Sequence, residues 1–365
     1  GGGRVMVLGA SRKREGTVGP ANSLREGMRC GSAVAVMAVV CVVSLLVHAD
    51  SRLKGYNVDA SSITVSGVSS GGFMAVQLHV AFSSFIRGVG VVAAGPFYCA
   101  QFNLEIAQGP CMAYPDLIVA KELEGITAAT ALSGFIDGTK NLADARVYLF
   151  SGSKDSVVHP GVVKKLKSYY EFYVGGSGSV VANYTFPAEH AWITDSWGNS
   201  CDHLGSPWIN NCGYDMAGAV LKHMYGALNM RSPPLQNPQF VEFSQSEFTP
   251  GAFTNKEIGM GDTGFLFVPE SCQSGNLSCK LHVSLHGCEQ DFNSVQDAFI
   301  KHTGLLEWAT TNNIIVLFPQ AQSNLLNPKS CWDWWGYTGS AYASNVGMQM
   351  QSIHSMLNRI VFGER

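Results

Sequence analysis

The sequence predicts an α/β fold with a mostly parallel central sheet and helices on both faces. Short apolar runs of strand length alternate with longer stretches that suit helices. A strand at 63–66 leads through a Gly-rich turn directly into a helix at 71–81. The chain is 46% hydrophobic and 14% charged, against about 25% charged in an average soluble protein, so its 365 residues can bury a large core.

The other expected elements follow in chain order. We expect strands at 88–94, 146–150 and 180–186, and then a helix at 216–224. Residues 233–250 are rich in Pro, Gln, Ser and Phe and are predicted to cross the surface as a connection. Beyond them we expect strands at 264–268, 281–285 and 314–318 and helices at 295–309 and 346–360. Neither half has enough strands for a complete sheet, so we interpret residues 50–365 as one domain.

Residues 1–49 are predicted to be an N-terminal extension followed by a secretory signal peptide. An apolar run with one serine covers 33–47 behind a basic flank, and Val47 and Ala49 place small residues before a cleavage site. A run of about 15 apolar residues suits a signal peptide, whereas a membrane span needs about 20. Met28 lies where such a signal peptide would start. We therefore expect a secreted, extracellular protein without stable membrane insertion after cleavage.

The cysteine pattern agrees with export. Of the 10 cysteines, eight come after residue 49, an even set that allows 105 pairings. Proximity in the sequence predicts the disulfides Cys99–Cys111, Cys201–Cys212, Cys272–Cys279 and Cys288–Cys331. No spacing typical of a zinc site occurs among these cysteines, so no metal is expected. Asn183 and Asn276 begin Asn-x-Ser/Thr sequons and are candidate glycosylation sites.

A G-x-S-x-G motif at 67–71 places Ser69 at the turn between the first strand and its helix. In that context small neighbours permit a strained turn that exposes the serine hydroxyl as a nucleophile. The alternative is a Gly-rich turn with no chemical role. The formal net charge of −3 provides no field to hold nucleic-acid phosphates, so we expect no nucleic-acid partner.

A serine nucleophile needs a histidine base and an acid that orients the base. Asp155 lies on the loop after a predicted strand, and His190 follows the next strand. The alternatives are a turn-capping role for Asp155 and a packing role for His190. Asp137 has no strand before it, and His203 lies in a cysteine-bounded loop, so both are weaker candidates.

The tetrahedral intermediate of such a reaction needs two N–H donors. The amide of Ser70 is one candidate, and the His-Gly loop after 281–285 supplies the other at Cys288. That loop comes after His190 in the chain, so the usual order of these parts is rotated. Joining the C-terminal helix to the strand before Ser69 restores the order, which predicts a circular permutation.

These motifs together resemble the extracellular poly(3-hydroxybutyrate) depolymerases of the single-domain, circularly permuted α/β-hydrolase type. The wider esterase family includes feruloyl and acetylxylan esterases. The matching segments are GVSSGGFMA (67–75), GSKDSVV (152–158), AEHAW (188–192), LHGCEQ (285–290) and CWDWWGY (331–337). The resemblance implies Ser69 as nucleophile, Asp155 as acid, His190 as base, and the amides of Ser70 and Cys288 as the oxyanion hole. AEHAW departs from the smaller residues expected beside this histidine, so the cleft should differ in shape there.

The resemblance also implies a substrate and a cleft wall. We expect a polyester or a small ester as substrate, no cofactor, a monomer, and polymer contact through the surface of the catalytic domain itself. At least one of Trp332, Trp334 and Trp335 should line the cleft, whereas core packing is the alternative for each. The alternative functions are a feruloyl or acetylxylan esterase and a non-catalytic binding protein with the same fold.

Overall fold

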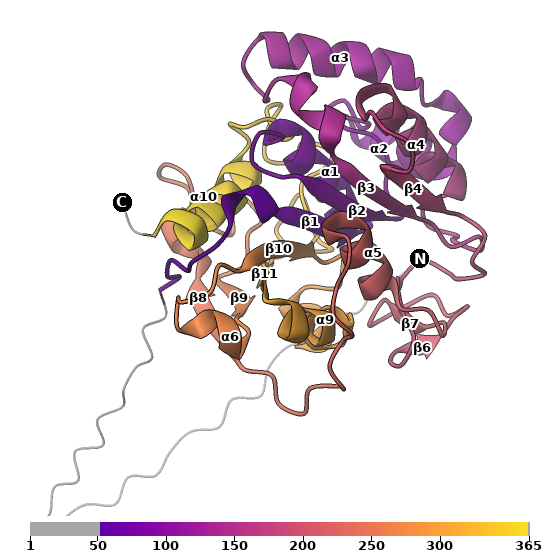
Figure 1. Ribbon diagram of the computed structural model, residues 1–365. Coiled ribbons are helices and arrows are strands. Elements are labelled where there is room, and N and C mark those ends of the chain that lie inside the picture. Colours follow the sequence, from indigo (N-terminus) through magenta and orange to yellow (C-terminus); the bar gives the residue numbers. More distant parts are fainter. Residues whose placement is uncertain (1–51, 364–365) are drawn as a thin grey trace, which may run out of the picture. The chain divides into compact units, whose positions relative to one another are not determined.

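The computed structural model describes residues 52–363 (Figure 1). The predicted extension and signal peptide, with Met28 and the cleavage site after Ala49, lie outside the described residues. Within the described range, no helix is long and apolar enough to cross a membrane.

A central sheet of eight strands has the order β4-β3-β2-β1-β10-β11-β9-β8. Strands β1 to β4, β10 and β11 run parallel, whereas β9 and β8 pair antiparallel at one edge. The strands are β1 Thr64–Val68, β2 Gly88–Val92, β3 Arg146–Phe150, β4 Val180–Asn183, β8 Phe240–Ser244, β9 Thr263–Phe267, β10 Lys280–Leu285 and β11 Ile314–Phe318. This mostly parallel sheet confirms the predicted fold class.

Helices cover both faces of this sheet (Figure 1). Successive side chains of β2 point to opposite faces of the sheet. Gly88 and Gly90 leave room for α5 on one face, while Val89 and Val91 point to the other face. Helix α1 contacts β1, β2 and β10, and α5 contacts β2 and β3. The helices are α1 Ser70–Ala81, α2 Leu104–Gln108, α3 Ala120–Leu132, α4 Pro160–Tyr173, α5 Met216–Tyr225, α6 Glu270–Gln273, α7 Phe292–Val295, α8 Ala298–His302, α9 Leu305–Asn312 and α10 Met348–Phe362.

A small parallel sheet, β5-β7-β6, follows the segment that carries His190. Its strands are β5 Trp192–Thr194, β6 Asn199–Ser200 and β7 Ile209–Asn211. The Cys201–Cys212 disulfide closes the loop between β6 and the end of β7. The sequence did not predict this sheet, because strands of two or three residues have too short a pattern to recognise.

Two predicted elements are wrong. Residues 233–250 are not only a connection, since they contain the edge strand β8, which pairs with β9. The single helix expected at 295–309 is instead three short helices, α7 to α9. Positive φ angles at Gln296 (54°) and Gly304 (81°) interrupt it, because a right-handed α-helix cannot continue through positive φ.

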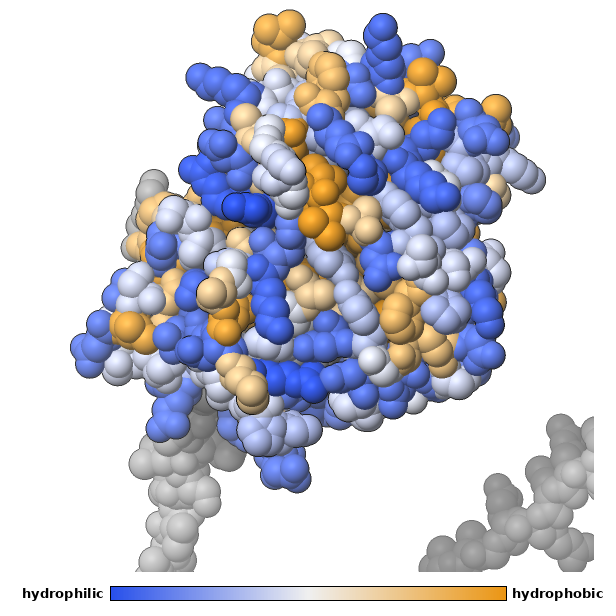
Figure 2. Space-filling view, turned by 45° about the vertical axis from the view of Figure 1, so that its right-hand side comes forward, coloured by the Kyte–Doolittle hydropathy of each residue, from blue (hydrophilic) through white to orange (hydrophobic). Residues whose placement is uncertain are grey.

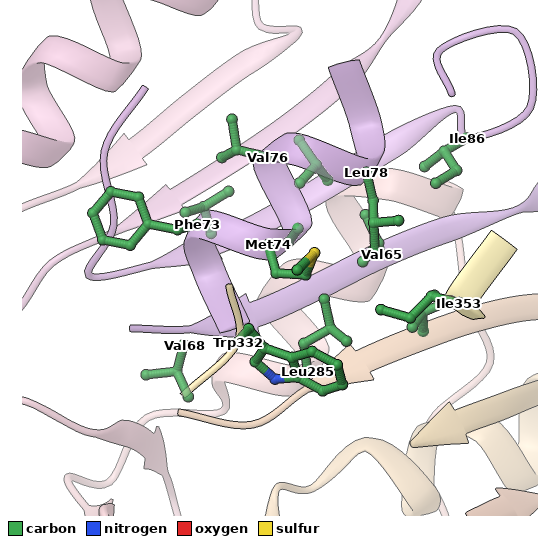
Figure 3. Packing of buried hydrophobic residues seen from close by; sticks show 14 of the residues in the cluster. Val65, Val68, Phe73, Met74, Val76, Leu78, Ile86, Leu285, Trp332 and Ile353 are labelled. Carbon is green, nitrogen blue, oxygen red and sulfur yellow. The ribbon is translucent and has the colours of Figure 1, made fainter. Parts of the chain in front are cut away.

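One hydrophobic core runs through the sheet and the helices packed on it, and Figure 3 shows its part around β1, α1 and β10. On the face in Figure 2, hydrophilic side chains predominate and hydrophobic ones form small separate patches. The four predicted cysteine pairs are all at bonding distance. The end of α10 lies beside the segment before β1, where the amide of Tyr56 donates to the carbonyl of Ile360 at 2.8 Å.

Candidate active site

Ser69 occupies a tight turn between β1 and α1. Its backbone has a positive φ of 57° with ψ −124°, a sparsely populated conformation that costs about 1–3 kcal/mol in a residue other than glycine. The turn is so close that a Cβ on Gly67 would lie 2.2 Å from the carbonyl oxygen of Gly71. The amide of Ser69 donates to Val92 at 2.9 Å, which fixes the turn to the end of β2. The strained turn therefore presents the Ser69 side chain at the carboxyl end of the sheet.

Asp155 and His190 form a buried pair. Nδ1 of His190 lies 2.9 Å from Oδ2 and 3.1 Å from Oδ1 of Asp155, and the two residues are only 6% and 7% exposed. Oδ1 also accepts from the amides of Val157 and Val158 at 3.0 and 2.8 Å. An ionised carboxylate only accepts hydrogen bonds, so the pair places the proton of a neutral imidazole on Nδ1. Nε2 is then free to act as a base.

Glu189 ties the loop of the acid to the loop of the histidine. Its Oε1 accepts from the amide of Ser156 at 2.7 Å and from the amide of His190 at 2.8 Å. Backbone bonds join the same loops, from Ser153 to Phe186 at 2.7 Å and from Lys154 to Ala188 at 3.1 Å. This residue is the departure in AEHAW noted in the sequence, and its contacts hold loops rather than shape a cleft. Sequence reasoning missed that role.

Ser69, His190, Gly287 and Cys288 line one cavity of about 700 Å³. Ser69 lies near Gly287 and Cys288 because β10 is the parallel neighbour of β1, with Gly67 opposite Leu285, so both strands end at the same edge. A Cβ on Gly287 would lie 3.4 Å from Cβ of Ser69. A second cavity of about 740 Å³ lies beside β8 and Tyr56, and its lining includes no predicted site residue.

The peptide between Gly287 and Cys288 is held by the buried His286. The amide of Ala321 donates to Nε2 of His286 at 3.0 Å, so Nδ1 carries the proton and donates to the carbonyl of Gly287 at 2.7 Å. Burial lowers the pKa of His286, which favours this neutral form. The carbonyl and N–H of a trans peptide point in opposite directions. The N–H of Cys288 is therefore directed away from His286.

Two of the three candidate tryptophans line the cavity, namely Trp334 and Trp335. The expectation for Trp332 needs correction, because this residue is 0% exposed and packs beside Leu285 in the core (Figure 3). Its Nε1 donates to the carbonyl of His286 at 3.0 Å. Trp332 thus supports the loop from behind instead of facing the cavity.

A buried carboxylate orders the tryptophan segment. Oδ1 of Asp333 accepts from the amides of Gly336 and Tyr337 at 2.6 and 3.0 Å, and Oδ2 accepts from the amide of Thr338 at 2.8 Å. Burial raises the pKa of Asp333, against the opposing effect of these donors. The Cys288–Cys331 disulfide joins the start of this segment to the loop of Gly287 and Cys288, the predicted oxyanion loop.

Trp208 is a cavity residue that sequence reasoning missed. Its ring lies edge-on to the imidazole of His190, with centroids 6.4 Å apart. It follows a cis Ser206–Pro207 peptide inside the Cys201–Cys212 loop, and its φ is 60°. No sequence signal marks such a residue, since its position depends on the small sheet that was not predicted.

The chain was compared with known proteins. No family model matches it. It is 46% identical over 339 residues to the poly(3-hydroxybutyrate) depolymerase of Delftia acidovorans, covering 92% of this chain and 66% of that protein. It is 39% identical over 337 residues to the polyhydroxybutyrate depolymerase of Talaromyces funiculosus, covering 86% of this chain and 94% of that protein. The chain belongs to the polyhydroxybutyrate depolymerase family.

Solved structures agree with this membership in the depolymerase family. The crystal structure of PHB depolymerase from Penicillium funiculosum matches with a TM-score of 0.77 and 36% identity, over 86% of this chain and 100% of that one. A serine-to-alanine variant of PHB depolymerase complexed with an R3HB trimer matches over the same shares, with a TM-score of 0.78. Acetylxylan esterase A of Emericella nidulans is 26% identical over 166 residues, which is 41% of this chain and 49% of that protein.

Proposed function

We propose that this member of the depolymerase family is a serine esterase that hydrolyses poly(3-hydroxybutyrate) or its oligomers. The observation that carries the proposal is the meeting of a strained Ser69 and a buried Asp155–His190 pair at one cavity. The relatives at 46% and 39% identity, named as depolymerases, support the same substrate. We assign Ser69 as nucleophile, His190 as base and Asp155 as the acid that orients it.

In the first half of the reaction, Oγ of Ser69 attacks the carbonyl carbon of the ester while Nε2 of His190 takes the hydroxyl proton. The carbonyl oxygen becomes an oxyanion, which the amides of Ser70 and Cys288 stabilise. The bond to the alcohol oxygen then breaks, and the alcohol leaves with the proton from His190. The acyl group remains as an ester on Ser69.

In the second half, water attacks the acyl carbon and gives its proton to Nε2 of His190. The second oxyanion uses the same two amides. When it collapses, the bond to Ser69 breaks and Oγ recovers the proton, releasing the free acid. Asp155 keeps the imidazole in one tautomer and stabilises the imidazolium that forms in both halves.

The cavity wall suits an uncharged ester. Phe73, Trp334 and Trp335 supply aromatic surface, and the Phe73 and Trp334 rings stack at 4.0 Å. Lys329 and Glu289, which are also in the lining, pair with each other at 3.2 Å. A compact, methyl-bearing hydroxybutyrate unit matches such a site better than a charged substrate does.

We further propose that the protein is exported and acts as a monomer, with residues 50–365 as one catalytic domain. Four disulfides support export, since such bonds persist in oxidising compartments. Asn276 is exposed and Asn183 ends the edge strand β4, so both remain proposed glycan sites. The bond from Tyr56 to Ile360 supports our interpretation of the rotated order as a circular permutation.

The test compares the mature chain with its Ser69→Ala variant. Wild-type protein should hydrolyse p-nitrophenyl butyrate, and a fluorophosphonate should label it at Ser69, whereas the variant should do neither. No turnover and no labelling would instead identify a non-catalytic protein of this fold.

Substrate preference needs rates on hydroxybutyrate oligomers, poly(3-hydroxybutyrate) granules, methyl ferulate and acetylated xylan. We expect the oligomers and granules to be cleaved fastest. Faster cleavage of ferulate or acetylxylan would replace the depolymerase assignment with the corresponding esterase and leave the triad intact. Cleavage of oligomers alone would identify an oligomer esterase.

A further inference from the structure

Gln290 is a buried side chain whose amide joins the oxyanion loop to a distant segment. It is 1% exposed and lines the cavity. Its Oε1 accepts from the amide of Gly287 at 2.7 Å. Its Nε2 donates to the carbonyls of Pro207 and Trp208 at 3.1 and 3.0 Å. One planar group therefore connects backbone atoms that lie about 80 residues apart, using both its acceptor and its donors.

The far end of this connection leads to His190. The carbonyl of Trp208 also accepts from the amide of Trp192 at 3.0 Å, so it is shared between Gln290 and the first residue of β5. Trp192 follows His190 by only two residues, and the Trp208 ring lies against the imidazole. A shift of Gln290 would therefore pass directly to the segment that holds His190.

The near end leads to the oxyanion loop. Gly287 precedes Cys288, and its two backbone polar groups are held from different sides, the N–H by Gln290 and the carbonyl by His286. His286 orients the peptide, whereas Gln290 is the group that relates the loop to the opposite wall of the cavity.

We propose that Gln290 is a positioning residue that sets the separation between the Cys288 amide and the His190 imidazole. This inference rests on the proposed function. The donor and the base must act on the same ester group at the same time, and a misplacement of about 1 Å can cost about 100-fold in rate. Glutamine fits the role because the loop offers a donor while the far segment offers two acceptors. An ionised glutamate would place an oxygen against both carbonyls of the far segment.

The test uses Gln290→Ala and Gln290→Glu on an ester substrate. We expect kcat to fall about 10- to 100-fold in both variants while KM stays within about twofold, since the bond network acts on geometry in the transition state. The affinity for butylboronic acid should fall by a similar factor. Its boron bonds to Oγ of Ser69, whose proton passes to His190, and the resulting tetrahedral adduct needs the oxyanion donors.

The Glu variant gives a second signature. Burial and the facing carbonyls raise the pKa of a carboxyl at this position, and the protonated form regains an O–H donor. The ratio of its kcat to that of wild type should therefore rise as the pH falls. This ratio remains decisive if Gln290→Ala does not fold.

Gln245→Ala is the matched control. Gln245 is also fully buried and also joins two backbone segments, accepting from the amide of Gln320 at 3.0 Å and donating to the carbonyls of Gln320 at 2.9 Å and Gly261 at 2.6 Å. It is not in the cavity lining. It should lose stability on thermal unfolding but keep kcat and boronate affinity.

Two results would overturn the inference. In one, Gln290→Ala resembles the Gln245 control, with lower stability but unchanged kcat and boronate affinity. In the other, the Gln290→Glu ratio is independent of pH. An inactive wild-type protein is a distinct outcome, because it removes the proposed function and this inference with it.

Discussion

The stability of the fold should be sensitive to acid at β1 and β10, the strands that lead to Ser69 and to the loop of Gly287 and Cys288. His282 of β10 is 0% exposed and lies between two hydroxyls of β1, with Nδ1 2.8 Å from Oγ1 of Thr64 and Nε2 2.8 Å from Oγ of Ser66. Burial lowers the pKa of His282 from 6.5 to about 3. The folded protein therefore keeps this imidazole neutral at pH values where an unfolded chain protonates it.

The difference in pKa between the folded and unfolded chain determines how stability changes with pH. Between pH 6.5 and 3 the unfolded chain binds a proton that the folded protein does not, so stability is lost as the pH falls through this window. The loss is about 1.4 kcal/mol per pH unit for one group. Lowering the pH from about 7 to 4.5 should therefore cost about 2–3 kcal/mol from His282 alone.

Guanidinium unfolding of the disulfide-intact protein at the two pH values measures this loss. His282→Gln keeps hydrogen-bonding atoms without a titrating ring, so its acid-induced loss should be smaller than that of wild type by about 2–3 kcal/mol. His203→Gln is the control, because this histidine is exposed and its replacement should leave the loss unchanged. An equal loss in wild type and His282→Gln would refute the reasoning.

Three further predictions concern the site. Ser69→Ala and His190→Ala should each lower kcat by on the order of 10⁴-fold without unfolding the protein, since triad members act as a unit; a near-normal rate in either would mean a wrong assignment. Glu189→Ala should lower kcat about tenfold by freeing two amides, whereas Glu189→Gln keeps the acceptor and should stay near wild type; equal rates in the pair would exclude this contact from catalysis. Trp332→Phe should lower the free energy of unfolding by about 1–3 kcal/mol, as measured by denaturation, whereas Trp334→Ala should raise KM about threefold to tenfold. A changed KM in Trp332→Phe together with an unchanged KM in Trp334→Ala would contradict the placement of these residues.

Local sequence signals were sufficient where one motif determined the structure around it. The G-x-S-x-G turn predicted the strand, the turn and the helix around Ser69, because only small neighbours permit so close an approach. The spacing of strands also placed Asp155 and His190 on loops that the structure brings together. Proximity in the sequence was enough for three disulfide pairs, whose cysteines are only 7 to 12 residues apart, and Cys288 and Cys331 were the two that remained.

Features that depend on distant contacts could not be predicted. Within the described sheet, strand β8 lies at the edge and pairs only with β9. Its Pro-rich sequence therefore resembled a connection, and only the pairing with β9 shows that it is a strand. The three tryptophans of CWDWW have the same local pattern, and only the turn around Asp333 separates a core position from two cavity positions. The roles of Glu189 and Gln290 depend on amides from other loops, which no single segment reveals.

The Cys288–Cys331 bond has a consequence for where the protein can work. It spans 43 residues and joins the loop of the proposed oxyanion donor to the segment that carries the cavity tryptophans. In a reducing compartment this bond does not persist, so the loop would lack one of its anchors. In a chain held inside the producing cell, hydrogen bonds alone would hold this loop to the cavity wall, so the fully anchored cavity would be obtained by directing synthesis to an oxidising compartment.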